Sequence, residues 1–299
     1  MSEQTRNGRL QDKVVLIFGA GPNIGGTCAH FMAREGAKIA AVSSRPETSA
    51  ETVKFLTEHG YEGVAIAADA TQEADIERAV AETVQHFGGI DCMIHTAGRQ
   101  IRRDVMVQDL AAWDEQMKGY LTGAMLATKH TARIMVEKGA AGSIIYVLSD
   151  AAHQGEAGNA CYSAAKAGLL NFSRAAAMEF SRYGIRVNSV SPTYMEQNLW
   201  MWGPGALEFE RGPYNLSFDD FLRGIPLGRP CRTADVANTA VFLASDESSF
   251  LTAVDIPLDG GARANYWPWT PGKYTGVTGA GYVETMVPNR YGVPIAREE

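Results

Sequence analysis

Long apolar runs are missing from this sequence, and cysteine and histidine are too sparse to build a metal centre. No apolar stretch approaches the roughly 20 residues that a membrane-spanning helix needs. The six histidines form no HxH or HExxH pattern, and the four cysteines form no CxxC pair: they are Cys28, Cys92, Cys161 and Cys231. These absences predict no transmembrane helix, no metal site and thiols that stay reduced.

Basic residues are also fewer than acidic residues. The chain has 27 Lys and Arg against 34 Asp and Glu, which gives a formal net charge of -7. Such a balance argues against a nucleic-acid or anionic-membrane surface. The N-terminal stretch MSEQTRNGRLQDK is polar and lacks the apolar centre of a signal peptide. We therefore expect a cytoplasmic protein whose partner is a small molecule.

What the chain does contain is a regular alternation of short apolar or β-branched runs with longer helical patterns. The expected strands span residues 14–18, 38–42, 64–67, 92–95, 143–148, 186–191 and 254–258. The expected helices lie near residues 24–35, 48–59, 73–87, 111–138, 162–183 and 233–244. This alternation predicts an α/β fold with a doubly wound, parallel, seven-stranded sheet in one domain, because right-handed βαβ crossovers cover both faces of such a sheet.

Two segments depart from the alternation, and both are dense in aromatic residues among glycines and prolines. The first spans about residues 194–224, and the second is a C-terminal extension over residues 263–299. So much apolar surface is unusual for exposed loops. One interpretation is a substrate lid and an extended arm that close over a bulky hydrophobic ligand. The other is that both segments bury subunit interfaces.

A glycine-rich turn joins the first strand to the first helix in the stretch VVLIFGAGPNIGG. Small residues at this junction let the backbone approach a dinucleotide pyrophosphate at the helix N-terminus. Gly19, Asn23, Ile24 and Gly25 are therefore candidate cofactor-binding residues. The alternative is a tight strand-to-helix turn that binds nothing.

The end of the second strand bears on the choice of cofactor. A carboxylate there binds the ribose 2′-hydroxyl of NAD, whereas this chain has Ser43, Ser44 and Arg45, with no acid until Glu47. Hydroxyl groups and a guanidinium suit a 2′-phosphate, which favours NADP over NAD. The alternative is an ordinary polar loop after a strand.

Tyr162 and Lys166 stand four residues apart in the alanine-rich stretch ACYSAAKAG. Positions four apart share one face of a helix, so the two side chains are neighbours. A phenol with an ordinary pKa of about 10 is a poor base at neutral pH, and a nearby ammonium favours its ionised form. The spacing thus indicates an acid–base pair rather than an incidental polar stripe.

Several motifs stand in the order and spacing of one enzyme family. FGAGPNIG stands where that family has TGxxxGxG, HTAG where it has NNAG, and YSAAK where it has YxxxK. AADAT supplies Asp69, YVLSD places Ser149 thirteen positions before Tyr162, and RVNSVSPT resembles RVNxxxPG. Over about residues 10–262, the chain resembles the short-chain dehydrogenase/reductase family, whose fold is Rossmann-like.

The resemblance implies a role for each matching residue. Tyr162 would be the catalytic acid and base, Lys166 would activate it and reach the nicotinamide ribose, and Ser149 would hydrogen-bond the substrate oxygen. Further cofactor contacts implied by the resemblance are Asp69, Ala70, His95, Ala97, Gly98, Pro192, Thr193 and Met195.

The chain departs from the family pattern at a few of these positions. Asn23 replaces a glycine of the phosphate loop, Thr193 replaces the glycine after Pro192, and Gln197 replaces a later threonine. Tyr120 stands where the family has an asparagine that holds a water in a proton relay. Tyr120 could carry the relay through its hydroxyl, displace the water, line the substrate pocket or simply pack the helix.

These observations together predict an NAD(P)-dependent short-chain alcohol dehydrogenase or ketoreductase. The expected reaction interconverts a secondary alcohol and a ketone on a bulky hydrophobic or aromatic substrate. By resemblance we expect a homo-oligomer, either a tetramer or a dimer. Two alternatives are a lyase or dehalogenase-type enzyme of the same fold and a non-catalytic dinucleotide-binding protein.

Overall fold

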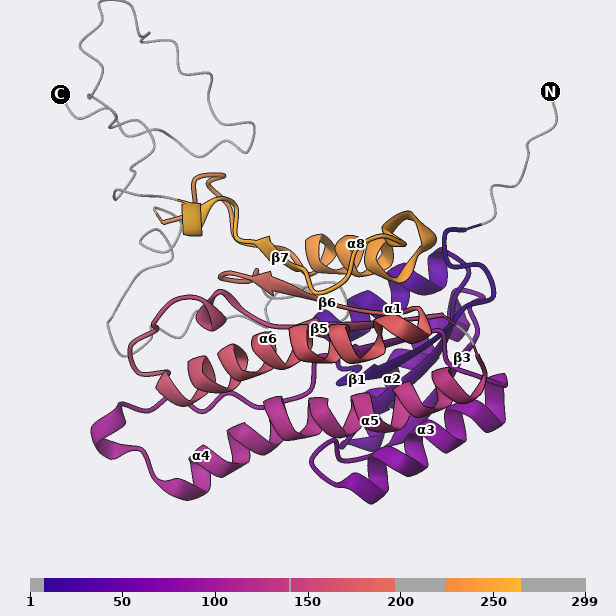
Figure 1. The fold of residues 1–299 in the computed structure, drawn as a ribbon, viewed down its shortest axis with the longest axis horizontal. Helices are drawn as coiled ribbons and strands as arrows, with labels where there is room; N and C mark the ends of the chain where they lie inside the picture. The colour runs from indigo at the N-terminus through magenta and orange to yellow at the C-terminus, as the bar shows by residue number, and fades with distance from the viewer. Residues whose placement is uncertain (1–7, 140, 197–223, 265–299) are drawn as a thin grey trace, which may run out of the picture.

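A seven-stranded parallel sheet forms the centre of the structure, which is a computed structural model that describes residues 8–139, 141–196 and 224–264 (Figure 1). The strands lie in the order β3-β2-β1-β4-β5-β6-β7, and each neighbouring pair is parallel. Their bounds are Val14–Phe18 (β1), Lys38–Ser43 (β2), Gly63–Ala67 (β3), Cys92–His95 (β4), Gly142–Val147 (β5), Ile185–Pro192 (β6) and Asp255–Leu258 (β7). The predicted doubly wound, Rossmann-like sheet is confirmed.

Helices cover both faces of this sheet. They are Ile24–Arg34 (α1), Pro46–Glu58 (α2), Glu73–Phe87 (α3), Leu110–Met117 (α4), Gly123–Glu137 (α5), Ala160–Phe180 (α6) and Thr233–Ala244 (α8). Helices α3, α5 and α6 pack on one face, with α5 and α6 side by side, and α1, α2 and α8 pack on the other (Figure 1).

Two hydrophobic cores follow from this arrangement, one on each face of the sheet. The alternation of side chains along β1 sends Leu16 and Phe18 into the core under α3 and α5. Val15 and Ile17 point into the core under α1 and α8. All five residues of β1 are buried, because a central strand of a doubly wound fold has no solvent-facing side.

One expected helix is interrupted. The sequence pattern predicted a continuous helix near residues 111–138, but α4 and α5 are separated by a π-helical turn, η2, over Lys118–Thr122. At this turn the backbone of Gly119 approaches that of Gly98, since a Cβ on Gly119 would lie 3.3 Å from the Gly98 Cα. The interruption therefore reflects a tertiary contact that helical periodicity does not report.

Parts of two expectations lie outside the described residues. Most of the proposed lid, including Gln197, falls in residues 197–223, and almost all of the C-terminal extension falls in residues 265–299. Within the described ranges, no helix combines the length and the hydrophobicity that crossing a bilayer requires.

The edge of the sheet depends on a fully buried asparagine. Asn188 on β6 donates through Nδ2 to the carbonyl of Leu251 at 2.8 Å, and its Oδ1 accepts from the amide of Val254 at 3.1 Å. Both backbone groups lie in the segment that leads into β7. Asn188 therefore joins the last strand to the rest of the sheet.

The substitution Asn188→Ala should lower the free energy of unfolding by about 2 kcal/mol, because it removes a buried side chain that pairs with the carbonyl of Leu251 and the amide of Val254. Urea unfolding would measure the change. The matched control is Asn171→Ala at an exposed position of α6, which should change stability little. Equal, small effects of the two substitutions would contradict this assignment.

Candidate active site

Ser149, Tyr162 and Lys166 meet at the carboxyl end of β5. Ser149 follows this strand by two residues, and Tyr162 and Lys166 lie one turn apart near the start of α6. Ser149 lies beside Tyr162, close enough for its hydroxyl to lower the pKa of the phenol. Lys166 Nζ donates to the carbonyl of Val147, the last residue of β5, at 2.7 Å. The three residues singled out in the sequence are thus neighbours in space.

Burial controls the ionisation of this group. Lys166 is only 4% exposed, and loss of solvation lowers its pKa to about 7. Burial likewise raises the pKa of Tyr162, and the Ser149 hydroxyl offsets only part of that rise. The sequence reasoning expected Lys166 to lower the pKa of Tyr162. In the structure the Lys166 ammonium lies 5.6 Å from the phenol ring centroid, and burial is the main cause of the raised pKa of Tyr162.

Tyr120 projects from η2 toward the same group. Its ring meets that of Tyr162 edge to face, with centroids 5.1 Å apart and planes at 78°. Lys166 Nζ lies 4.5 Å from the Tyr120 ring centroid, which is within the range of a cation–π contact. Gly98 leaves the space for this ring, since a Cβ there would lie 2.2 Å from two of the ring carbons. Tyr120 is 6% exposed and belongs to the site rather than to the solvent-facing side of its helix.

His95 ends β4 and is buried beside the ring of Phe18, with centroids 6.2 Å apart. Burial and the charge of Lys166 lower its pKa to about 3, so the imidazole is neutral at physiological pH. Its Nε2 has no hydrogen-bond partner among the described residues. A buried ring nitrogen without a partner at this end of the sheet is a group that a ligand could satisfy.

The glycine turn takes the conformation that its sequence suggests. Gly19 has a φ of +87°, and a Cβ there would lie 2.5 Å from Thr96 Oγ1. A Cβ on Gly25 would lie 2.1 Å from the Gly19 carbonyl oxygen, so this pair must be small. Asn23 is the N-cap residue of α1, and its side chain makes no capping hydrogen bond. The first turn of α1, beginning at Ile24, is thus not capped by that side chain.

The polar residues after β2 and β3 differ in how they are engaged. Arg45 is exposed and, within the described residues, forms no salt bridge, while its amide donates to Ser43 Oγ at 3.2 Å. Ser44 beside it is also exposed. The Asp69 carboxylate already accepts from the amide of Thr71 at 2.9 Å, so it shapes the turn before α3.

The remaining candidates have structural neighbours that the motifs do not indicate. The carbonyl of Ala70 lies close to Gly123, where a Cβ would come within 2.4 Å of its oxygen. Pro192 ends β6, and the Thr193 side chain lies near Asp150, where it lowers the pKa of that carboxyl. Met195 forms an isolated bridge with Cys231. Ala97 packs at the edge of the core under α3 and α5.

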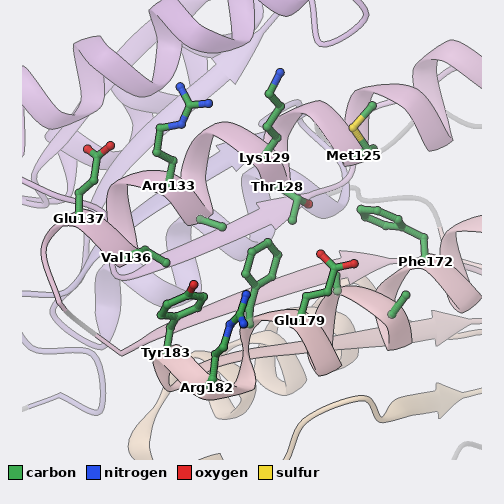
Figure 2. Close-up of a pocket in the computed structure, with 14 residues that line it drawn as sticks. Met125, Thr128, Lys129, Arg133, Val136, Glu137, Phe172, Glu179, Arg182 and Tyr183 are labelled. Atoms are coloured by element: carbon green, nitrogen blue, oxygen red, sulfur yellow. The ribbon is translucent and has the colours of Figure 1, made fainter.

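A separate hollow lies between α5 and α6 (Figure 2). Its floor is apolar and includes Val136 and Phe172, whereas its rim carries charges of both signs: Lys129, Arg133, Glu137, Glu179 and Arg182. Ser149, Tyr162 and Lys166 are not among its lining residues. This hollow is therefore distinct from the site at the end of β5.

Sequence reasoning missed a cluster of charged residues on the other side of Ser149. Its members are Asp150, His153, Asp255, Asp259 and Arg263. The residues are scattered over more than 100 positions, and their spacing gives no sign that they meet. Strand order, rather than any local pattern, brings them together.

Comparison with known proteins places the chain in a family. A family model described as enoyl-(acyl carrier protein) reductase matches residues 19–263. The chain is 32% identical over 262 residues to the uncharacterized oxidoreductase YxbG of Bacillus subtilis, covering 87% of this chain and 94% of that protein. It is 31% identical over 259 residues to 2,3-dihydro-2,3-dihydroxybenzoate dehydrogenase of the same organism, covering 85% of this chain and 97% of that protein.

A solved structure agrees with these sequence relatives. A gluconate 5-dehydrogenase from Burkholderia cenocepacia, in complex with NADP and tartrate, superposes with a TM-score of 0.78 at 27% identity. The match covers 86% of this chain and 97% of that chain. With the sheet order and the family match over most of its length, the chain belongs to the short-chain dehydrogenase/reductase family and is an oxidoreductase of that family.

Proposed function

We propose that the protein is an NAD(P)-dependent dehydrogenase or reductase that interconverts a secondary alcohol and a ketone. The observation that carries the proposal is the contact of Ser149 with Tyr162 beside the buried Lys166 at the end of β5. Ligands of open α/β sheets bind at this end of the strands.

In the proposed reaction, Ser149, Tyr162 and Lys166 each have a different role at the substrate oxygen. Ser149 hydrogen-bonds that oxygen and orients it toward Tyr162. The raised pKa keeps Tyr162 protonated at neutral pH, which is the state that a proton donor to a ketone requires. Lys166 supplies positive charge beside the phenol as the proton leaves, and it would hold the ribose of a bound nicotinamide cofactor. A bound nicotinamide would supply or accept the hydride.

The described residues fit such a dinucleotide. The turn at Gly19 and Gly25 keeps the backbone close to the N-terminus of α1, where a pyrophosphate is favoured by the helix dipole. His95 Nε2 is a buried polar atom without a partner in the described chain, and it lies on the strand next to β1. Arg45, exposed and without a salt bridge there, suits a 2′-phosphate, so NADP is the preferred cofactor of the proposal. The relative that binds NADP supports the same choice.

The proposed substrate is a bulky hydrophobic or aromatic alcohol or ketone. The aromatic content of residues 194–224 and 263–299 motivates it. A relative named for a cyclic diol, 2,3-dihydro-2,3-dihydroxybenzoate, supports a ring-bearing substrate. The glycine turn and Lys166 both argue against the lyase or dehalogenase alternative, and the complete Ser149, Tyr162 and Lys166 set argues against a non-catalytic binding protein.

We further propose that the protein acts as a homo-oligomer. The hollow between α5 and α6 combines an apolar floor with a rim of both charges, a composition that suits contact with a second copy. Sedimentation or mass photometry of the full chain would measure the assembly.

Thermal unfolding with NADPH or NADH, followed by a panel of ketones monitored through nicotinamide absorbance, tests the proposal. Stabilisation by a cofactor and turnover of a ketone are expected. Stabilisation without turnover of any ketone or alcohol would favour the non-catalytic alternative. Turnover of a halohydrin without nicotinamide would favour the dehalogenase.

Tyr162→Phe should fold normally, keep cofactor-induced stabilisation and lose activity by roughly 10²–10⁴-fold, because it removes the group that transfers the proton. Steady-state rates with the preferred ketone give the measurement. The matched control is Tyr183→Phe, a partly exposed tyrosine outside the site, which should retain its rate. Near-normal activity of Tyr162→Phe would refute the mechanism.

The protein should prefer NADP(H), and Arg45→Ala should weaken NADPH binding more than NADH binding. Loss of one charge-assisted contact costs about 1.5–3 kcal/mol. Titration of both cofactors into both proteins measures the difference, and Arg174→Ala on an exposed turn of α6 serves as the control for lost charge. A wild-type preference of tenfold or more for NADH would show that Ser43 and Ser44 only leave space at the end of β2 and do not bind a 2′-phosphate.

Tyr120→Phe should retain most of the rate, whereas Tyr120→Leu should lose up to about 30-fold, the equivalent of roughly 2 kcal/mol for a desolvated cation–π contact. The reason is that the ring face, which phenylalanine keeps, contacts Lys166 and Tyr162. Comparing kcat for the two variants decides between the roles. If Tyr120→Phe is as slow as Tyr120→Leu, the hydroxyl carries the proton relay instead.

A further inference from the structure

The short turn that follows Ser149 is held at its outer side by charged residues from the edge of the sheet. Ser149 caps this turn, since its Oγ accepts from the amide of Ala151 at 3.2 Å, and the turn continues as the 3-10 helix η3 over Asp150–Ala152. Asp150, which begins this helix, and His153, which follows it, contact charged residues on or just beyond β7. Ser149, which orients the substrate oxygen in the proposed reaction, is therefore part of a segment held from outside. We call the contacts of Arg263 and Asp255 with Asp150 and His153 the clamp.

Arg263 forms the first half of the clamp. Its Nε lies 3.2 Å from Asp150 Oδ1 and 3.2 Å from Asp259 Oδ2. Its Nη2 lies 3.7 Å from Asp255 Oδ2. The guanidinium side chain is 17% exposed, so these interactions are only weakly screened by water. One cation thus joins the Ser149 turn, β7 and the segment after β7.

Asp255 forms the second half. Its Oδ1 accepts from the hydroxyls of Ser189 and Ser191 on β6, at 2.7 and 2.9 Å. Its Oδ2 lies 2.8 Å from His153 Nε2. The Asp255 side chain is 5% exposed, and its position on the edge strand is therefore defined by four separate contacts. His153, at the end of the turn that follows Ser149, thus contacts β7 through Asp255, which Arg263 also contacts.

The charges of this cluster depend on Arg263. Three carboxylates, those of Asp150, Asp255 and Asp259, face one guanidinium and one histidine. Burial raises the pKa of Asp150, while the Thr193 side chain and the charge of Arg263 oppose that rise. Asp259 differs, because hydrogen bonds from the amides of Arg263 and Gly261, together with the hydrogen bond and charge of the Arg263 guanidinium, outweigh burial and lower its pKa. Both carboxylates therefore interact with the Arg263 cation, and Asp150, whose pKa stays raised, has the weaker support of the two.

We infer that Arg263 is a positioning residue, which acts through Asp150 and through the Asp255–His153 pair to hold the Ser149 hydroxyl against Tyr162. The inference rests on the proposed function for the role of Ser149. Arg263 itself contacts neither Ser149 nor Tyr162 in any described interaction, so its effect on the reaction is indirect. Loss of the cation would free Asp150 to turn toward water and would let the capped turn shift.

Arg263→Ala in the full chain should lower kcat by about 10- to 100-fold, the loss expected when a reacting group is displaced by a fraction of an ångström to 1 Å. Cofactor-induced thermal stabilisation should be mostly retained, because the clamp lies away from the glycine turn and meets the expected cofactor contacts at Thr193 beside Asp150. Millimolar guanidinium should restore part of the lost rate in Arg263→Ala and none in Tyr162→Phe. Arg263→Lys, which keeps a cation, should lie between wild type and Arg263→Ala.

The matched control is Arg186→Ala. Arg186 is a half-buried arginine near the opposite end of β6, where it donates to Ser248 Oγ and to the carbonyls of Leu243 and Ser245. Its removal should lower stability without lowering kcat at a temperature where the protein stays folded. An equal loss of kcat in the two variants, or an unchanged kcat in Arg263→Ala, would overturn the inference.

Amide hydrogen exchange gives a readout that does not need activity. The amides of Ala151, Ala152, His153 and Gln154 are all hydrogen-bonded within the turn. Their exchange should quicken several-fold in Arg263→Ala and not in Arg186→Ala. Unchanged exchange would refute the clamp. A wild-type protein that reduces no ketone, yet shows the faster exchange in Arg263→Ala, would refute the proposed function and leave the clamp intact.

Discussion

The hydrogen bond from the Lys166 ammonium to the Val147 carbonyl is the interaction on which the geometry of the site depends. At 2.7 Å it fixes the start of α6 against the end of β5. Tyr162 lies one turn before Lys166, and Ser149 lies two residues after Val147, so this one contact sets where the phenol and the serine hydroxyl meet. The pKa of about 7 indicates that the carbonyl and the Tyr120 ring only partly replace the lost water.

The sheet and most helices could be predicted because their signals are local. A strand such as β1 is apolar at every position, and a helix such as α3 begins with acidic residues and ends at Gly88, whose φ is +85°. The π-helical turn at Lys118–Thr122 could not be predicted in this way. Its cause is the approach of the Gly98 backbone, which belongs to a loop about 20 residues earlier in the chain.

The site was predictable where the spacing along one element is enough. Tyr162 and Lys166 share a helical face, and the motif spacing indicates Ser149. The pKa of Tyr162 was not predictable, because the sequence reports the neighbouring lysine and not the burial that raises the pKa. The contacts of Arg263 could not be predicted for another reason. The strand order β5-β6-β7 brings its partners Asp150 and Asp255 to it from distant parts of the sequence (Figure 1).

The contact between Gly98 and Tyr120 makes these two positions one steric unit. The ring at position 120 fills the space that a side chain at position 98 would need, since a Cβ there would lie only 2.2 Å from two ring carbons. Position 98 therefore cannot take a side chain while the ring is present. The φ of +138° at Gly98 disfavours a side chain there in any case, and a smaller residue at 120 would uncover the Lys166 ammonium. Through this shared volume, the loop after β4 controls how much water reaches the lysine, although Gly98 itself carries no charge.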